Sequence, residues 1–443
     1  MNRRIFSAMI TVGVLTAVSK GVSVSKDLAT AYVFGAGDAL DAFLIAWLVP
    51  SFAINLVSGS LNAALIPTYI QVWRQEGESA AQRLFASTMV CNMLLVLTVA
   101  MVLSVSGHHL LPMVASGFDP EKLAYTESLY QLLLPCLFLT GMATTWHALL
   151  NARERFAVAS LTPVISTGIT TILILLLGQR VGIVALAGGV VVGFLAEAAV
   201  LGWRLAGEGV SVLPRWHGVT TPLKQVWMQY IPMLAGAFMM GGTEVIGQSL
   251  AARLGPGSNA VLSYASKLPT LVVGIGTFAV STAVLPYFSQ LAAAGDSGGL
   301  RRTLWTYCGL IALVTVPTTL LLILFSDGLV YLLFQRGEFS TEDAARVAAV
   351  QVLYLLQIPF FSVGILAVRL ISALRANQVL MWSSAMNLLV SAVLTYTLIQ
   401  WLSVAGIALA TSLTYVLSMV YLLFMASRLI TRMEQSRVSP SQS

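Results

Sequence analysis

The sequence predicts an all-α polytopic membrane protein with twelve transmembrane helices in two parallel six-helix lobes. Three observations support this class. Of 443 residues, 57% are hydrophobic and only 9% are charged, whereas soluble domains are about 25% charged. The apolar residues form long stretches, and motifs of the first half recur in the second half. The composition excludes a soluble enzyme, a disordered chain and a nucleic-acid-binding domain, so no nucleic acid partner is expected.

Twelve apolar stretches are long enough to cross a bilayer, which takes about 20 residues per helix. They are residues 5–29, 39–72, 84–105, 129–150, 161–177, 181–201, 227–250, 260–291, 304–325, 347–374, 379–398 and 402–425. Several exceed one bilayer thickness, so we expect these helices to tilt, kink or protrude.

Basic residues predict the orientation of the spans. With the N-terminus inside, fifteen of the 24 Lys and Arg residues fall in cytoplasmic segments and five in outside loops. This asymmetry follows the positive-inside rule. We therefore expect both termini in the cytoplasm.

A motif of two glycines followed by two prolines occurs twice, and its prolines are 17 residues apart in both copies. The copies contain Gly35, Gly37, Pro50 and Pro67, and then Gly255, Gly257, Pro269 and Pro286. Because six spans separate the copies, the repeats are parallel, and a substrate is expected at their interface. The first three residues of each copy are candidate hinges for alternating access. Ordinary kinking for helix packing is the alternative for the prolines.

The repeat predicts the domain boundaries. The N-terminal lobe is residues 1–206 and the cytoplasmic linker is residues 207–224. The C-terminal lobe is residues 225–428, and a polar cytoplasmic tail follows at residues 429–443.

Three lysines within spans are candidates for binding an anionic headgroup. Lys20 and Lys26 lie in the first span and Lys267 lies early in the eighth. A charge at bilayer depth costs at least about 2.5–3.5 kcal/mol, so it should face a cavity or a partner. A basic cluster in a cleft would attract phosphate or diphosphate, although internal pairing with Asp27 or Asp41 is an alternative. Glu197 and Arg369 lie late in their spans, and we expect both to extend to the cytoplasmic interface.

A second set of residues is a candidate site for a coupling ion, Na⁺ or H⁺. Glu244 is an acid within a span, and Asn387 and Thr411 could supply oxygen ligands. The alternative for Glu244 is a protonated packing residue. No nucleotide-binding motif, metal-ligand spacing or catalytic constellation occurs in the sequence. We therefore expect neither a resident cofactor, nor a metal, nor an enzyme.

Several motifs together resemble a known family. They are Ser19-Lys20, Lys26-Asp27, Phe34-Gly35-Ala36-Gly37, Asp41-Ala42-Phe43, Leu150-Asn151-Ala152-Arg153, Tyr264-Ala265-Ser266-Lys267 and Leu333-Phe334-Gln335-Arg336-Gly337-Glu338-Phe339. This pattern resembles the MurJ/MviN lipid II flippases of the multidrug/oligosaccharidyl-lipid/polysaccharide exporter superfamily. The resemblance implies a V-shaped transporter whose cationic cavity takes the diphosphate and sugars of a polyprenyl-linked precursor.

The resemblance also assigns roles to single residues. Lys20, Lys26 and Lys267 match family positions that are usually arginine, and Asp27 and Asp41 match family acids that orient the basic groups. Asn55 lies in an uncharged stretch where the family usually carries an arginine pair, and it is a further candidate for substrate binding. The family also commonly has two additional C-terminal helices. These departures keep the substrate open between lipid II and a related exopolysaccharide or O-antigen precursor.

The predicted function is therefore a flippase that moves a lipid-linked saccharide diphosphate across the bacterial inner membrane by alternating access. The expected partners are this substrate, membrane lipids and enzymes of polysaccharide or peptidoglycan synthesis, and the expected state is a monomer. Two alternatives remain open. One is a cation-coupled multidrug or metabolite exporter of the same superfamily, and the other is a membrane scaffold without transport activity.

Overall fold

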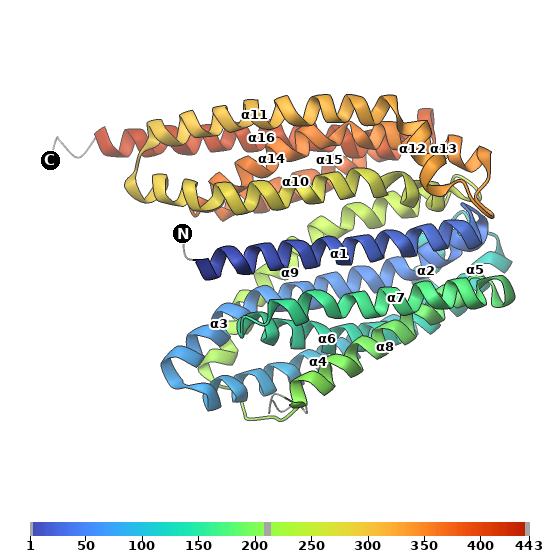
Figure 1. The fold of residues 1–443 in the computed structure, drawn as a ribbon, viewed down its shortest axis with the longest axis horizontal. Coiled ribbons are helices and arrows are strands. Elements are labelled where there is room, and N and C mark those ends of the chain that lie inside the picture. The colour runs from blue at the N-terminus through green and yellow to red at the C-terminus, as the bar shows by residue number, and fades with distance from the viewer. Residues whose placement is uncertain (1–2, 208–213, 439–443) are drawn as a thin grey trace. The chain divides into compact units, whose positions relative to one another are not determined.

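A computed structural model describes residues 3–207 and 214–438, and within them every regular element is a helix (Figure 1). The elements are α1 (Arg3–Phe34), α2 (Asp38–Ile54), η1 (Asn55–Gly59), α3 (Ser60–Glu76), α4 (Glu78–Val114), α5 (Pro120–Leu133), α6 (Pro135–Ala152), α7 (Phe156–Val181), α8 (Val184–Gly207), α9 (Thr221–Ala251), α10 (Ser258–Ala294), α11 (Ser297–Leu324), α12 (Ser326–Phe334), α13 (Thr341–Leu355), α14 (Gln357–Ala373), α15 (Asn377–Leu402) and α16 (Val404–Val438).

The predicted all-α membrane fold is confirmed. Each of the twelve apolar stretches is helical, and nine helical segments of the described chain are long and apolar enough to cross a membrane. The other three predicted stretches lie on α1, α9 and α10. Two stretches expected as single helices are each divided in two, at Leu134 before α6 and at Leu356 before α14. Pro135 begins α6, where its missing N–H group costs nothing.

Large apolar side chains cover the outside of the helices. Trp401, Trp203 and Met228 are 85%, 78% and 75% exposed. A water-soluble protein rarely exposes so many large apolar groups in contiguous patches. These surfaces are suited to lipid chains, which solvate them at no hydrophobic cost.

The chain divides into two compact units. The first contains residues 1–257 together with Phe334–Ser340, and the second contains Ser258–Leu333 and Thr341–Ser443. Each unit has its own apolar core: Leu65, Trp146 and Tyr230 are buried in the first, whereas Phe288 and Leu366 are buried in the second. The predicted lobe boundary, at residues 207–224, lies earlier than this division, and residues 208–213 of that linker lie outside the described part.

Corresponding helices of the two halves have matching lengths, as the repeat predicts. α7 and α15 both contain 26 residues, and each ends at a residue with positive φ, Gly182 and Ser403. The continuous helix formed by α2, η1 and α3 has 39 residues, and its counterpart α10 has 37. The duplicated prolines lie inside these two long helices.

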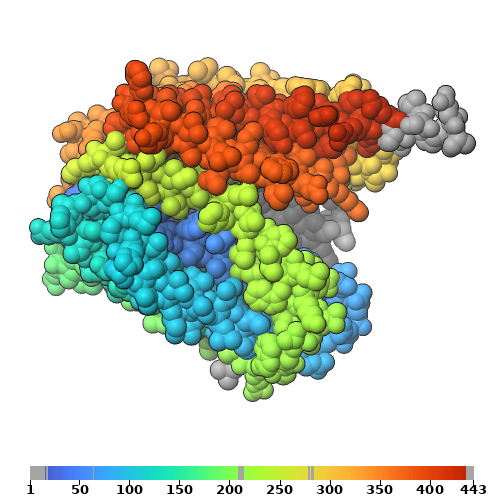
Figure 2. Space-filling model, turned by 180° about the vertical axis from the view of Figure 1, so that it is seen from behind, coloured from blue at the N-terminus to red at the C-terminus, as the bar shows by residue number. Residues whose placement is uncertain are grey.

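Helix α9 departs from the repeat in its packing. Its counterpart α1 packs on α7, but α9 packs on α2, η1, α3 and α4 of the first unit. Figure 2 shows α9, in yellow-green, against the blue surface of this region. The Tyr230 hydroxyl donates a buried hydrogen bond to the Val57 carbonyl at 3.0 Å, and the rings of Phe52 and Phe238 meet edge to face.

Small residues bring α7 and α8 close together along their length. The Thr170 hydroxyl donates to the Gly189 carbonyl at 3.0 Å. A Cβ added at Gly193 would lie 2.5 Å from the Ser166 carbonyl oxygen. Such close backbone approach is typical of helix packing in membranes, where van der Waals contact and interhelical hydrogen bonds drive association.

We expect Gly193→Ala to lower the free energy of unfolding by about 1–3 kcal/mol, because the added methyl group must push α7 and α8 apart. Thermal unfolding of the purified protein in detergent measures this loss. The matched control is Gly188→Ala on the same helix, whose Cβ would meet nothing within 4 Å. The control should be neutral or slightly stabilising, since alanine favours a helix. Equal melting temperatures for both variants would contradict the close contact.

Candidate functional site

The predicted basic residues of the first unit lie on α1. Lys20 is exposed, whereas Lys26 and Asp27 are partly buried. Counted along the helix from its end at Phe34, Lys20 lies about 21 Å and Lys26 about 12 Å from that end. Lys20, Lys26 and the adjacent Asp27 therefore lie well inside the span.

Lys267 lies on α10 in the second unit, about 14 Å from the start of that helix at Ser258. It is partly buried and lies two residues before the buried Pro269. Lys26 and Lys267 thus have similar distances from the glycine turns that precede α2 and α10. The two lysines are not equivalent positions of the repeat, because Lys26 precedes its turn on α1 and Lys267 follows its turn on α10.

Asp41 is completely buried near the start of α2 and makes an ion pair with Lys122 of α5, with 3.6 Å between Oδ2 and Nζ. Lys122 also pairs with Asp38, and its Nζ lies 3.7 Å from the centroid of the Phe118 ring. The Lys122 side chain is only 10% exposed. Sequence reasoning assigned Asp41 to the substrate and did not single out Lys122, which falls in a predicted outside loop.

The predicted glycine turns have the conformation that favours glycine. Gly35 has a φ of 58°, and Gly255 has a φ of 106°. A Cβ at Gly35 would lie 2.5 Å from the Glu338 carbonyl oxygen, and the Glu338 N–H group donates to the Tyr32 carbonyl at 3.0 Å. Segment Phe334–Ser340 therefore packs directly on the turn between α1 and α2. Hinge motion at these glycines remains a prediction.

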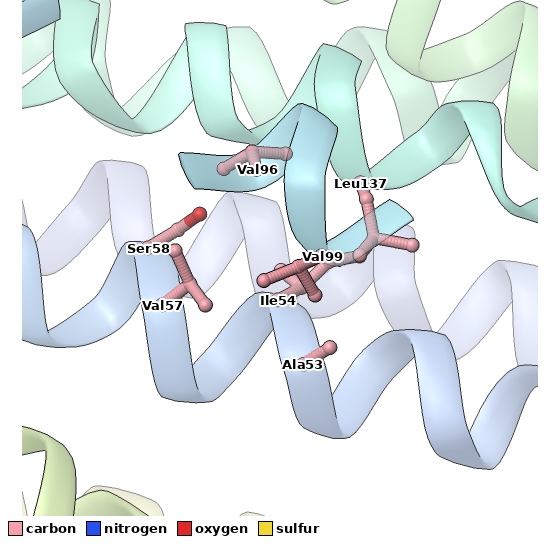
Figure 3. A pocket seen from close by; sticks show the side chains of 7 residues that line it. All are labelled: Ala53, Ile54, Val57, Ser58, Val96, Val99 and Leu137. Carbon is pink, nitrogen blue, oxygen red and sulfur yellow. The ribbon is translucent and has the colours of Figure 1, made fainter. Parts of the chain in front are cut away.

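Asn55 is exposed and begins the five-residue π-helical turn η1, which follows the buried Pro50 by one turn. Beside this turn is an apolar pocket with an empty volume of about 160 Å³ (Figure 3). Ala53, Ile54, Val57 and Ser58 line one side of the pocket, and α4 and α6 line the other. Ser58 is the only polar residue of its lining, so this crevice is too apolar for a diphosphate headgroup.

The three predicted ion-coupling residues have separate partners. Glu244 is exposed on α9, where the Gln248 side-chain amide donates to its carboxylate at 3.2 Å. In the second unit, the Asn387 amide donates to the Ser418 hydroxyl at 3.1 Å. The Thr411 hydroxyl donates to the Ile407 carbonyl of its own helix. Ion coupling by these residues remains a prediction.

The expectation for Glu197 is wrong. Its side chain does not extend to the membrane interface but is 3% exposed and lies among α6, α7 and α8. On α6, His147 faces it, and His147 Nε2 lies 3.7 Å from Glu197 Oε1. Sequence reasoning missed His147, because a single histidine in an apolar span carries no spacing signal.

Comparison with known proteins identifies the family. The family model described as "Lipid II flippase MurJ" matches residues 30–439. The chain belongs to the MurJ lipid II flippase family. A relative from Synechocystis sp., named "Probable lipid II flippase MurJ", is 26% identical over 368 residues, which cover 79% of this chain and 68% of the relative. A "Lipid II flippase MurJ" from Burkholderia cenocepacia is also 26% identical, over 78% of this chain and 68% of its own length.

Solved structures share the fold. "Lipid II flippase MurJ, inward closed conformation" matches with a TM-score of 0.82 and 19% identity, over 96% of this chain and 90% of that chain. An inward-facing multidrug resistance MATE family transporter of the MOP superfamily matches with a TM-score of 0.77 and 12% identity, over 95% of both chains. The MurJ family resemblance and the polytopic transporter fold predicted from sequence are therefore confirmed. Membership also supports the predicted class of function, flipping of a lipid-linked saccharide in a bacterial inner membrane.

The ion pair between Lys122 and Asp41 gives a test of the geometry at this end of the first unit. We expect Lys122→Met to lower the free energy of unfolding by about 3 kcal/mol, because it leaves a buried carboxylate without this partner. Adding Asp41→Asn should recover at least half of the loss. Thermal unfolding of the single and double variants measures both effects.

Asp38→Asn is the matched control for this cycle. Asp38 is half exposed, so its pair with Lys122 is worth about 1 kcal/mol or less. A Lys122→Met protein that unfolds at the wild-type temperature would show that the buried pair is not a structural requirement.

Proposed function

We propose that this chain flips a polyprenyl-diphosphate-linked saccharide from the inner to the outer leaflet of the bacterial inner membrane by alternating access. Membership in the MurJ family supports the class of substrate. The observation that carries the proposal further is the set of lysines at bilayer depth: Lys20 and Lys26 on α1, and Lys267 on α10. Groups that are so costly to place in a membrane are kept for a function.

The chemistry of these lysines suits a diphosphate. Each ammonium group is a compact point charge that donates up to three hydrogen bonds to phosphate oxygens, without the planar fork of arginine. Asp27 follows Lys26 directly and would orient the basic groups. Asn55, exposed at the π-helical turn, would donate its amide to the headgroup at a depth close to that of Lys20.

Energy for the cycle would come from an ion or from the membrane potential, because the sequence has no nucleotide-binding motif. Moving one elementary charge through 100 mV supplies about 2.3 kcal/mol. Glu244, Asn387 and Thr411 are the residues proposed from the sequence for a Na⁺ or H⁺ site.

Reconstituted vesicles test the proposed substrate and the lysine site together. A fluorescent lipid II and a fluorescent polyprenyl-diphosphate oligosaccharide are incorporated, and exposure of the label to a membrane-impermeant quencher follows flipping. We expect Lys20→Ala, Lys26→Ala and Lys267→Ala each to reduce the flipping rate at least tenfold, because each removes a charge-assisted contact worth about 1.5–3 kcal/mol. The corresponding Arg variants should retain activity.

Lys224→Ala is the matched control, since Lys224 is an exposed lysine in the first turn of α9. Its flipping rate should equal that of the wild type. Wild-type rates for all three Ala variants would overturn the lysine site. Comparing the two labelled substrates decides between lipid II and another lipid-linked saccharide.

A second candidate function is cation-coupled export of small amphipathic molecules. The exposed acid Glu244 on α9 and the fold likeness to a MATE transporter favour it. The basic pair on α1 opposes it, because like charges repel a cationic drug. Binding of cationic dyes to the purified protein, without binding of polyprenyl-diphosphate saccharides, would support this alternative.

A further inference from the structure

A buried polar cluster lies inside the first unit, away from the lysines and outside the predicted ion-coupling set. Helices α6, α7 and α8 enclose it, and each contributes a polar side chain: His147, Thr162 and Glu197. His147 Nε2 lies 2.8 Å from Thr162 Oγ1 and 3.7 Å from Glu197 Oε1. Ser166, one turn after Thr162, lies within hydrogen-bonding reach of the Glu197 carboxyl group.

The carboxyl group of Glu197 is incompletely satisfied. The residue is 3% exposed, and its Oε2 atom is buried without a hydrogen-bond partner. Counted along α8, Glu197 lies about 20 Å from Val184 and about 15 Å from Gly207, so it is deep in the span. An unpartnered carboxylate oxygen at this depth is expensive. A proton on Oε2 removes the charge, which is the largest part of this cost.

The hydrogen bonds indicate how the proton is held. The Thr162 hydroxyl donates to the Val158 carbonyl at 3.1 Å, so Thr162 Oγ1 accepts a hydrogen bond from His147 Nε2–H. The same N–H group faces Glu197 Oε1. The His147 side chain is 17% exposed and the Glu197 side chain is 4% exposed, so the imidazole ring is the more accessible of the two groups to water. His147 and Glu197 together can bind and release one proton.

Other charged groups lie farther away or have their own partners. Arg153, which directly follows α6, pairs with Glu78 at 2.9 Å. On α6 itself, Cys136 is buried in the first turn. On α8, Arg204 is two turns beyond Glu197. On α7, the titratable residue is Arg180, in its last turn.

The helices packed against these three also carry titratable groups. Cys91 lies on α4, next to Asn92, whose side-chain amide donates to the Gly141 carbonyl of α6. Tyr130 of α5 donates to Leu103, Asp41 of α2 pairs with Lys122, and Tyr69 and Arg74 lie on α3.

Helix α1, which packs on α7, carries Lys20, Lys26 and Asp27. Val33 of α1 contacts Gly178 of α7, and both helices run from the predicted cytoplasmic side. Lys20 precedes Val33 on α1 by 13 residues, and Ser166 precedes Gly178 on α7 by 12 residues. Lys20 and Ser166 therefore lie at about the same depth along the two parallel helices. A change of charge at Glu197 therefore occurs at the depth of a lysine proposed to hold the diphosphate.

We infer that His147 and Glu197 form a proton-binding site inside the first unit. The ligand is H⁺, taken up by the pair from water and returned to water, with no covalent bond to other atoms. The proton binding does not depend on the proposed flipping function. Only the use of this proton to drive the transport cycle rests on that proposal.

Infrared difference spectroscopy of the wild-type protein in lipid vesicles tests the site without any transport substrate. Changing the pH between 5 and 8 should change a protonated-carboxyl band that shifts on exchange into heavy water. Glu197→Gln should remove this band. His147→Gln should move its titration midpoint by about one pH unit, because the two groups titrate as a coupled pair.

Glu78→Gln is the matched control, since Glu78 is an exposed acid at the end of the bundle, and its spectra should equal those of the wild type. A wild-type protein without this band, or a Glu197→Gln protein that keeps it, would overturn the site. Loss of the band when NaCl replaces choline chloride would also overturn it, in favour of Na⁺. If Glu197→Gln does not fold, the His147→Gln shift and the wild-type titration decide alone.

Flipping assays with an imposed pH gradient address the coupling separately. If the band titrates as expected and no saccharide is flipped, the proton site stands and the proposed function fails. If saccharide is flipped and the band is missing, the function stands and the proton site fails.

Discussion

The interior of a lipid bilayer offers no water, so every polar group inside it must be satisfied by the protein itself. This constraint explains why the described chain is built from helices and why its few buried charges are paired. It also explains the hydrogen bonds between helices, such as those from Thr170 to Gly189 and from Tyr230 to Val57. Asp41 obeys the same constraint through Lys122, and Glu197 meets it only in part.

The fold was predictable because membrane helices depend mainly on local composition. Apolar runs located the nine helical segments of the described chain that are long and apolar enough to cross a membrane, and the equal proline spacing indicated the repeat. The packing of α9 was not predictable from that symmetry. Residues such as Phe238, which meets Phe52, attach α9 to the first unit, and they have no signal in the repeated motifs. The sequence does not predict that two stretches divide at Leu134 and Leu356, because apolar residues continue through both, although Pro135 and Pro359 lie close to these breaks.

The candidate site was predictable only residue by residue. Charges within apolar stretches identified Lys20, Lys26 and Lys267, because such residues are rare and conspicuous. The sequence does not predict which charged side chains form ion pairs, because Lys122 and Asp41 are far apart along the chain and come into contact only in the fold. The contact between His147 and Glu197 was hidden for the same reason. Long-range contacts between single polar residues depend on how helices are rotated about their axes, which hydropathy does not specify.

The π-helical turn Asn55–Gly59 has a consequence for the symmetry of the two halves. A wider turn accommodates one more residue than an α-helical turn and offsets everything after it by about a quarter of a revolution. Pro50 and Pro67 flank such a turn, whereas Pro269 and Pro286 are joined by α-helix throughout. Although the two proline pairs have equal spacing in the sequence, Pro67 and Pro286 therefore lie on different faces of their helices. A single π-helical turn thus makes the helices of the two duplicated halves bend in different directions.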